Sequence, residues 1–163
     1  MTIRAVVITL SDKGARGERE DQSGPAIAVM LEALGMEIIE QRIIPDEQEM
    51  IRRALLECCD ERQADLIVTT GGTGVSPRDV TPDATREVID REIPGMGEAM
   101  RGASAAVTPH AMISRALAGI RGRTLIVNLP GSPKGARENL AALLPALPHA
   151  IAKIKGDDRD CAS

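Results

Sequence analysis

Three short runs of aliphatic residues place the strongest limit on what this chain can fold into. The runs are Ala5–Leu10, Asp65–Thr70 and Arg123–Asn128, and the centre of each consists of Val, Ile or Leu without polar alternation. Continuous apolar runs are typical of strands covered on both faces, whereas strands with one face exposed to solvent alternate apolar and polar residues. The runs therefore predict an α/β fold with a mostly parallel sheet between layers of helices. Residues 36–44 are more mixed, as expected of an edge or neighbouring strand.

Helix-start signals lie between these predicted strands. Ser23–Pro25 is expected to open one helix. Thr81 and Ser132 each precede a proline, the pattern of an N-cap before a first helical proline. Asp46 begins a capping-box-like segment before another helix. The resulting order β-α-β-α-β-α-α-β-α predicts one doubly wound domain, which we place at residues 1–155, with a flexible tail at 156–163.

Composition narrows the classes of function. The 163 residues carry a formal charge of −4 and include no Phe, Tyr or Trp. The basic surface and the aromatic stacking used by nucleic-acid-binding proteins are therefore both missing. No segment approaches about 18 consecutive apolar residues, and the N-terminal run is too short for a secretory signal. Cys58, Cys59 and Cys161 show neither zinc spacing nor a disulfide framework. We expect a soluble cytoplasmic protein with buried or half-buried thiols.

Glycine, proline and polar residues gather after the predicted strands. Residues 11–24 follow the first strand, Pro45-Asp46 the second, Gly71 and its successors the third, and residues 128–134 the last. Ligands of doubly wound sheets bind beyond the carboxyl ends of the strands. The four loops therefore predict a ligand site at one edge of the sheet.

The segment Thr69–Thr85, with the sequence TTGGTGVSPRDVTPDAT, matches neither common nucleotide motif. Gly72 and Gly74 could begin G-x-G-x-x-G, but Pro77 stands where the third glycine belongs. A Walker A loop needs G-K-[ST] at the start of a helix, and the chain has no such sequence. A Rossmann dinucleotide fold and a P-loop ATPase are both disfavoured.

The same segment is nevertheless suited to phosphate. The glycines of Gly71–Gly74 let backbone N–H groups approach an anion, and Arg78 could add a bidentate contact. Ser132 caps a predicted helix whose positive N-terminus could face the same anion, with Lys134 in its first turn. A tight connection without any ligand would also explain a glycine-rich loop.

Two aspartates at this edge could hold a metal ion. Asp79 cannot bind an anion directly, but together with Asp46 from a neighbouring loop it could hold Mg²⁺ that bridges phosphates. Each residue also has an ordinary explanation. Asp46 could cap a helix, and Asp79 could stabilise a turn or pair with Arg78. The residues alone leave both interpretations open.

Several motifs occur together in this chain: Ser11-Asp12, IPDE at residues 44–47, the segment Thr69–Thr85, IPGMGEAMR at Ile93–Arg101 and NLPGSPKG at Asn128–Gly135. In combination they resemble the molybdopterin-binding fold. Within it they resemble the MogA-type molybdopterin adenylyltransferases, which are related to the MoaB type and to the G domain of gephyrin. The resemblance covers about residues 3–154 and implies a three-layer α/β/α sandwich that assembles as a homotrimer.

The resemblance also implies a reaction, in which AMP passes from Mg-ATP to the terminal phosphate of molybdopterin and pyrophosphate is released, ahead of molybdenum insertion. Asp46 and Asp79 match the catalytically important pair of the family, and we expect this pair to hold the Mg²⁺. Implied partners are molybdopterin, ATP and, transiently, a molybdenum-insertion protein, with no nucleic acid or membrane. The residues expected to bind substrate or nucleotide are Ser11, Asp12, Gly71, Gly72, Thr73, Gly74, Ser76, Arg78, Glu98, Pro130, Gly131, Ser132 and Lys134.

The main alternative is a non-catalytic molybdopterin-binding or carrier protein of the MoaB type. Retention of Arg78–Pro82 together with Asp46 favours the adenylyltransferase. Hydrolase- or amidase-linked relatives of the fold are a further alternative, but they usually carry an extra domain.

Overall fold

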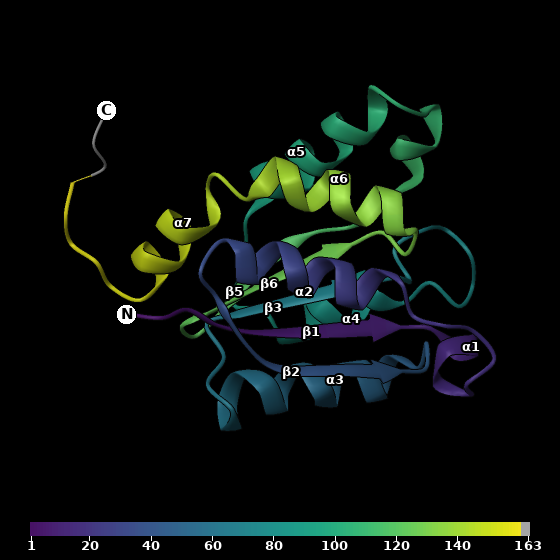
Figure 1. Cartoon of the computed structure of the whole chain (residues 1–163), viewed down its shortest axis with the longest axis horizontal. Helices are drawn as coiled ribbons and strands as arrows, with labels where there is room; N and C mark the ends of the chain where they lie inside the picture. The colour runs from purple at the N-terminus through teal and green to yellow at the C-terminus, as the bar shows by residue number, and fades with distance from the viewer. Residues whose placement is uncertain (161–163) are drawn as a thin grey trace.

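The three apolar runs form neighbouring strands at the centre of a six-stranded sheet. In the computed structural model, which describes residues 1–160, the strand order is β2-β1-β3-β6-β5-β4 (Figure 1). The runs correspond to β1, β3 and β6, and β2 is the predicted edge strand. The elements are β1 (Arg4–Leu10), α1 (Asp12–Ala15), α2 (Ser23–Ala33), β2 (Glu37–Ile44), α3 (Gln48–Leu56), η1 (Glu57–Glu61), β3 (Leu66–Thr70), α4 (Thr81–Val88), β4 (Arg91–Glu92), α5 (Pro94–Ala105), η2 (Pro109–Ile113), β5 (Ala118–Arg121), β6 (Thr124–Leu129), α6 (Pro133–Leu143) and α7 (Leu147–Ile154).

The sheet is mostly parallel, as predicted. β1 pairs in parallel with β2 and β3, and β3 pairs in parallel with β6. β5 and β4 extend the sheet in antiparallel register. The sequence pattern did not predict these two strands, which are only 4 and 2 residues long. A two-residue hairpin turn joins β5 to β6, and Gly122 within it has a φ of +55°.

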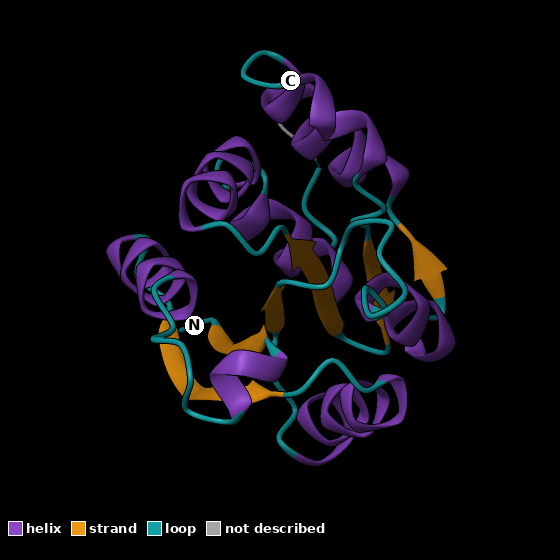
Figure 2. Ribbon diagram, turned by 90° about the vertical axis from the view of Figure 1, so that its right-hand side faces the viewer, coloured by secondary structure: helices purple, strands orange, loops and turns teal. Residues whose placement is uncertain are grey.

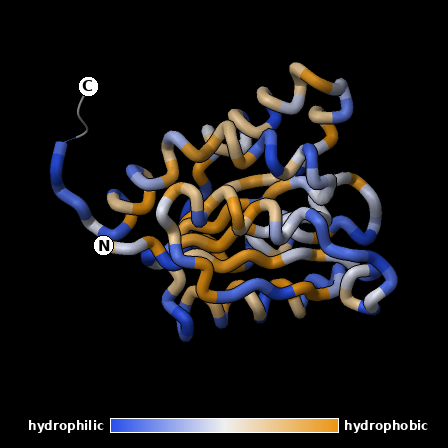
Figure 3. Tube along the Cα trace, viewed as in Figure 1, coloured by the Kyte–Doolittle hydropathy of each residue, from blue (hydrophilic) through white to orange (hydrophobic). Residues whose placement is uncertain are grey.

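Two hydrophobic clusters cover the two faces of the sheet and make it the middle layer of an α/β/α sandwich. One cluster packs α2, α5, α6 and α7 against residues such as Val7 and Val68. The other packs α3, η1 and α4 against their neighbours Ile8 and Ile67. Figure 2 shows helices on both sides of the strands, and Figure 3 shows the apolar strands enclosed between them. The predicted fold class is therefore confirmed.

Cys58 and Cys59 belong to the second cluster and are buried, as expected for structural thiols. Burial raises the pKa of the Cys58 thiol to about 11 and that of Cys59 to about 12. Both thiols are therefore protonated near neutral pH and poor nucleophiles.

Two of the predicted helix caps are wrong and one is confirmed. Ser132 caps α6, because its hydroxyl accepts a hydrogen bond from the Gly135 N–H. Thr81 is instead the first residue of α4, and its hydroxyl donates to the Gly71 carbonyl. Glu47, not Asp46, occupies the N-cap position of α3, where no side chain makes a capping hydrogen bond. The hydroxyl of Thr81 and the carboxylate of Asp46 are used at the sheet edge instead.

Residues 156–160 follow α7 without regular structure, and Asp157 pairs there with Arg159. The rest of the predicted tail, residues 161–163, lies outside the described residues, so its flexibility stays a prediction. Within residues 1–160, every helix is too short or too polar to cross a bilayer.

Candidate functional site

The carboxyl ends of β1, β2, β3 and β6 meet at one edge of the sheet, as predicted. From β1 the chain passes through α2 to β2 on one side, and from β2 through α3 to β3 on the other side. The boundary between β1 and β3 is therefore the topological switch point, where such sheets bind ligands. A cavity of about 790 Å³ opens there, lined by residues from the loops after all four strands. In Figure 1 this edge lies on the right, beyond the arrowheads of β1 and β2 and next to α1.

The structure brings eight of the predicted site residues to this cavity, and seven lie outside its lining. Pro130 and Lys134 instead line a second cavity of about 230 Å³, which shares Ser132 with the first. Glu98 is exposed on α5 and lines neither cavity, so its role stays a prediction. The residues that line the large cavity are Ser11, Asp12, Asp46, Gly71, Gly72, Asp79, Gly131 and Ser132. The remaining four, Thr73, Gly74, Ser76 and Arg78, lie in the loop between Gly72 and Asp79.

Gly71 and Gly72 are required for the close approach of three chain segments. Their φ angles of +104° and +66° lie in a region that favours glycine. A Cβ on Gly71 would collide with the Leu10 carbonyl at the end of β1. A Cβ on Gly72 would lie 3.1 Å from Asp46 Oδ1 and would collide with the Thr81 hydroxyl. These glycines therefore let Asp46 approach the loop after β3.

The carboxylate of Asp46 is held by the loop after β1. Its Oδ2 accepts a hydrogen bond from the Asp12 N–H at 3.0 Å, and its own N–H donates to Asp12 Oδ1 at 3.0 Å. Among the described residues, none donates a hydrogen bond to Asp46 Oδ1. Burial raises the pKa of Asp46, and the nearby negative charges of Asp12 and Asp79 add to the rise. Asp46 is thus an oriented carboxylate with one oxygen available to a ligand.

Asp79 is held in a comparable way. Its Oδ2 accepts a hydrogen bond from the Ser76 N–H at 3.0 Å, within a turn of its own loop. Gly74 gives this carboxylate room, because a Cβ at that position would lie 2.8 Å from Asp79 Oδ2. No described residue donates to Oδ1 of Asp79. Asp79 therefore does stabilise a turn, as considered in the sequence analysis, but its Oδ1 stays available to a ligand.

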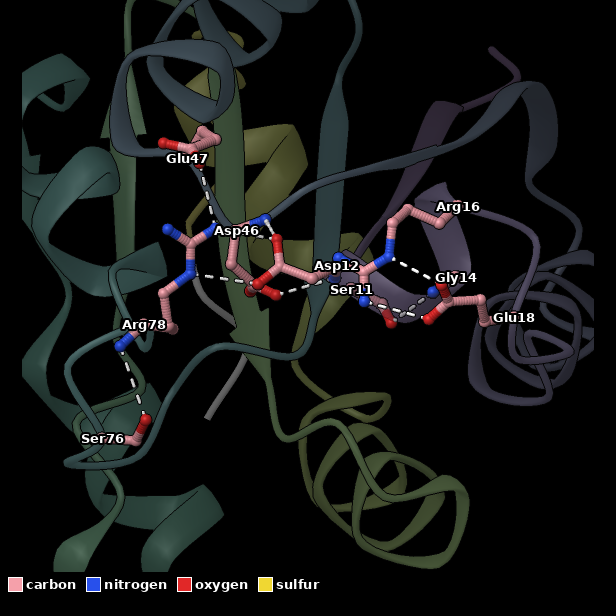
Figure 4. A network of polar contacts seen from close by, with 9 residues as sticks. All are labelled: Ser11, Asp12, Gly14, Arg16, Glu18, Asp46, Glu47, Ser76 and Arg78. Atoms are coloured by element: carbon pink, nitrogen blue, oxygen red, sulfur yellow. Dashed lines mark hydrogen bonds and ion pairs between the residues drawn. The ribbon is translucent and has the colours of Figure 1, made fainter.

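Arg78 pairs with Asp12 and Glu47, and not with Asp79, the partner considered in the sequence analysis. Its guanidinium makes a bidentate contact to Asp12 at 3.0 and 2.9 Å and a further contact to Glu47 at 3.0 Å (Figure 4). The ion pair with Asp79 is not formed, so that expectation is wrong. Arg78 lowers the pKa of Asp12 through this hydrogen bonding. Arg78 therefore joins the loops after β1, β2 and β3 across the edge of the site, as Figure 4 shows.

The turn after β6 is fixed beside the glycines. The Thr70 hydroxyl donates to the Pro130 carbonyl at 2.7 Å, and the Ser23 hydroxyl donates to the Gly131 carbonyl at 2.8 Å. A Cβ on Gly131 would lie 3.3 Å from the Cα of Gly71, so the two glycine loops touch. The N-terminus of α6, capped by Ser132, thereby lies at the cavity, where its positive end favours an anion.

Several residues of the loop after β1 also line the cavity but were not among the predicted site residues, although Asp21 begins a DQSGP motif shared with the family that the sequence resembles. Lys13 and Arg19 add cationic side chains. Asp21 is structural, because it accepts hydrogen bonds from the Thr9 hydroxyl at 2.7 Å and from the Gly24 N–H at 3.0 Å. The position of residues 11–24 after a buried strand was the signal that could have found them. The sequence did not reveal which side chains turn inward.

The acidic groups do not form a complete metal cage. Within residues 1–160, no group of three or more His, Cys, Asp or Glu side chains is placed to hold a metal ion. Asp46 and Asp79 both line the cavity, and each has an oxygen without a donor in the described residues. Mg²⁺ is often held by one or two carboxylates together with substrate phosphates, so two aspartates fit that ion.

Comparison with known proteins places this chain in a family. A family model described as "Probable molybdopterin binding domain" matches residues 6–149. The molybdopterin adenylyltransferase of Helicobacter pylori (strain J99) is 45% identical over 158 residues, which is 96% of this chain and 90% of the relative. Gephyrin of Dictyostelium discoideum is 44% identical over 91% of this chain and 22% of its own length.

A solved structure agrees with these relatives. The molybdopterin biosynthesis enzyme MoaB from Thermus thermophilus is 52% identical, with a TM-score of 0.90, and the match covers 95% of this chain and 98% of that one. The family match at residues 6–149 spans the sheet edge and the loops described above. On the sequence match and the fold together, this chain belongs to the family of molybdopterin-binding domains.

Proposed function

We propose that this chain is a molybdopterin adenylyltransferase of molybdenum cofactor biosynthesis. It would transfer AMP from Mg-ATP to the terminal phosphate of molybdopterin and release pyrophosphate. The name and 45% identity of the Helicobacter pylori relative support this activity. The observation that carries the proposal is the placement of Asp46 and Asp79 on one cavity with the glycine loop and the N-terminus of α6.

The chemistry of that transfer suits the groups present. An oxygen of the molybdopterin phosphate attacks the α-phosphorus of ATP, and the bond from that phosphorus to the oxygen bridging the β-phosphorus breaks. Both reactants are anions, so catalysis consists mainly of positioning and charge neutralisation. The backbone N–H of Gly72 and the start of α6 would hold phosphate, whereas the N–H of Gly71 already donates to the Leu129 carbonyl at 3.0 Å. The cationic side chains of Lys13 and Arg19 line the same cavity and would add positive charge.

Mg²⁺ would be held by Asp46 and Asp79 through the carboxylate oxygens that accept no hydrogen bond. When bound, the ion would neutralise negative charge on the substrate phosphates. The backbone N–H of Asp12 orients the first carboxylate, and the N–H of Ser76 orients the second. Neither residue needs to accept a proton in this proposal.

The direct test incubates the purified protein with molybdopterin and Mg-ATP labelled at the α-phosphate, and measures adenylylated pterin and pyrophosphate. We expect transfer by the wild type and a loss of about 100-fold or more in Asp79→Asn. Asp90→Asn is the matched control, because Asp90 also accepts one backbone N–H, from Gly122, but at the other end of the sheet. Undiminished AMP transfer by folded Asp79→Asn would show that the Asp79 carboxylate has no role in catalysis.

A second candidate is a molybdopterin-binding or carrier protein of the MoaB type, favoured by the 52% identity to the Thermus thermophilus structure. The AMP-transfer experiment distinguishes the carrier from the adenylyltransferase. Binding of molybdopterin without formation of pyrophosphate would support the carrier. ATP-dependent pyrophosphate release that requires molybdopterin would support the transferase.

We also propose that the chain forms a homotrimer and passes its product to a molybdenum-insertion protein. Exposed apolar side chains between α5 and β5, at Val107, Met112 and Ile113, support an assembly surface. Sedimentation equilibrium of the wild type and of Met112→Glu tests this assembly. A wild type that sediments as a monomer at micromolar concentration would contradict it.

A further inference from the structure

One arginine outside the predicted site anchors the loop that carries Asp79. Arg115 follows η2, and three of its N–H groups reach backbone carbonyls of this loop. Its backbone N–H donates to the Thr73 carbonyl at 2.7 Å, and Nε donates to the Gly74 carbonyl at 2.9 Å. Nη2 donates to the carbonyl of Asp79 at 2.5 Å. A single residue therefore holds both ends of the segment between Gly74 and Asp79.

The guanidinium of Arg115 is itself fixed by α4. It makes a bidentate ion pair with Asp83 at 3.0 and 2.9 Å. Asp83 lies in the first turn of α4, four residues after Asp79. This pairing orients the planar guanidinium so that its other N–H groups face the loop. Arg115 thus links the chain before β5, the loop after β3 and the start of α4.

The segment held in this way has little support of its own. Residues 75–78 are all exposed, whereas Thr73 is buried. Among the described residues, the side-chain contacts of this segment are those of Arg78 with Asp12 and Glu47 and the turn within the loop. The position of the Asp79 carboxylate therefore depends on where its backbone is anchored, and Arg115 provides that anchor.

We propose that Arg115 is a positioning residue for Asp79, an inference that rests on the proposed function of this site. The guanidinium contacts the backbone of the loop, and it acts on the reaction by fixing the carboxylate that would hold Mg²⁺. Displacement of a catalytic group by about 1 Å can cost about 100-fold in rate. Loss of Arg115 should therefore lower kcat for AMP transfer and raise the Mg²⁺ concentration needed for half-maximal rate. The pterin KM should change little.

The chain offers a closely matched control in Arg121. This residue makes a bidentate ion pair with Asp60 at 3.0 and 2.9 Å and donates to the Val88 carbonyl at 3.0 Å. It therefore has the same type of contacts but serves the opposite end of β5. Arg121→Met removes a comparable set of hydrogen bonds without touching the loop. Any effect specific to the site should appear in Arg115→Met alone.

The test compares the wild type, Arg115→Met, Arg115→Lys and Arg121→Met in two measurements. Hydrogen–deuterium exchange of residues 72–80 reports the anchoring itself, and AMP transfer as a function of Mg²⁺ reports its consequence. We expect faster exchange in this segment and a 10- to 100-fold lower kcat in Arg115→Met. Arg115→Lys keeps a charge beside Asp83 but cannot reach both carbonyls, so intermediate values are expected. Added guanidinium should partly restore Arg115→Met.

The proposal would be overturned if Arg115→Met matched Arg121→Met both in the hydrogen–deuterium exchange of residues 72–80 and in the Mg²⁺ dependence of AMP transfer. Arg115→Lys retains the ion pair, so it keeps the test decisive if the methionine variant does not fold. The exchange measurement needs no activity. If the wild type transfers no AMP, the proposed function fails, while the exchange of residues 72–80 still decides whether Arg115 anchors the loop.

Discussion

Asp12 and Asp46 each donate a backbone N–H to the other's carboxylate, at 3.0 Å in both directions. This reciprocal pair joins the ends of β1 and β2 and brings two negative charges together at the cavity. Arg78 neutralises only one of them directly, through its bidentate contact to Asp12. The two carboxylates consequently differ. The pKa of Asp12 is lowered by Arg78, whereas that of Asp46 is raised by burial and by its acidic neighbours.

The pH dependence of AMP transfer should reflect this asymmetry. If ionised Asp46 is required, its raised pKa places the acidic limb of the pH–rate profile above the range of an ordinary aspartate. Asp12→Asn removes a nearby negative charge, so the limb should move to lower pH. Asp60→Asn, which removes a carboxylate paired with Arg121 away from the cavity, should leave the limb in place. An identical limb in Asp12→Asn and the wild type would show that Asp46 does not govern the profile.

Asp46→Asn should lose activity without losing stability at neutral pH. The amide can still accept the Asp12 N–H, and it removes a charge that is disfavoured by burial and by Asp12 and Asp79. A raised pKa in the folded state means that ionised Asp46 destabilises the fold at pH 7. This destabilisation disappears as the pH falls through the folded pKa and below the ordinary aspartate value of about 3.9.

The thermal midpoint of Asp46→Asn should therefore equal or exceed that of the wild type at pH 7. The difference should vanish at acidic pH, where both proteins are neutral at this position. Thermal denaturation at several pH values measures this. A variant that is less stable than the wild type at pH 7 would mean that the charge of Asp46 contributes favourable contacts in the folded state.

The sheet, and the edge of it where the site lies, could be predicted because the sequence patterns that indicate them are local. Uninterrupted apolar runs identify strands buried on both faces, and glycines after a strand indicate a close approach. The sequence could not reveal contacts made between distant residues. Arg115 contacts a loop about 40 residues earlier in the chain, and the ion pair of Arg78 with Asp12 spans 66 positions. No local pattern predicts such pairs.

The misassigned caps have a related cause. A Thr or Asp before a helix usually caps it. Here the Thr81 hydroxyl instead bonds the Gly71 carbonyl at the start of its own loop, and the Asp46 carboxylate bonds the loop after β1. Tertiary contacts at a functional edge thus compete with local capping. The same residue types serve both purposes, so sequence alone cannot separate them.

Gly72→Ala should damage both the fold and the site. Gly72 has a φ of +66°, and an added Cβ would press on Asp46 Oδ1 and on the hydroxyl of Thr81. We expect a loss of about 1–3 kcal/mol in the free energy of unfolding and a large loss of AMP transfer. Gly102→Ala is the control, since a Cβ on this helical glycine meets nothing within 4 Å. It should raise stability by up to about 1 kcal/mol and preserve activity. Urea denaturation and the transfer assay would show equal effects of the two changes if Gly72 had no special role.

Thr81→Val should separate the stability of the chain from the geometry of its site. The buried Thr81 hydroxyl donates to the Gly71 carbonyl at 2.9 Å, and the buried Thr124 hydroxyl donates to the Ala64 carbonyl at 2.6 Å. Each valine variant loses one buried hydrogen bond of the same type, so each should be destabilised by about 1–2 kcal/mol in urea denaturation. Only Thr81→Val frees the carbonyl of Gly71 at the cavity, so only this variant should show a lower kcat for AMP transfer at saturating Mg-ATP. The hydroxyl of Thr81 would be purely structural if both variants lost stability alike and both kept the kcat of the wild type.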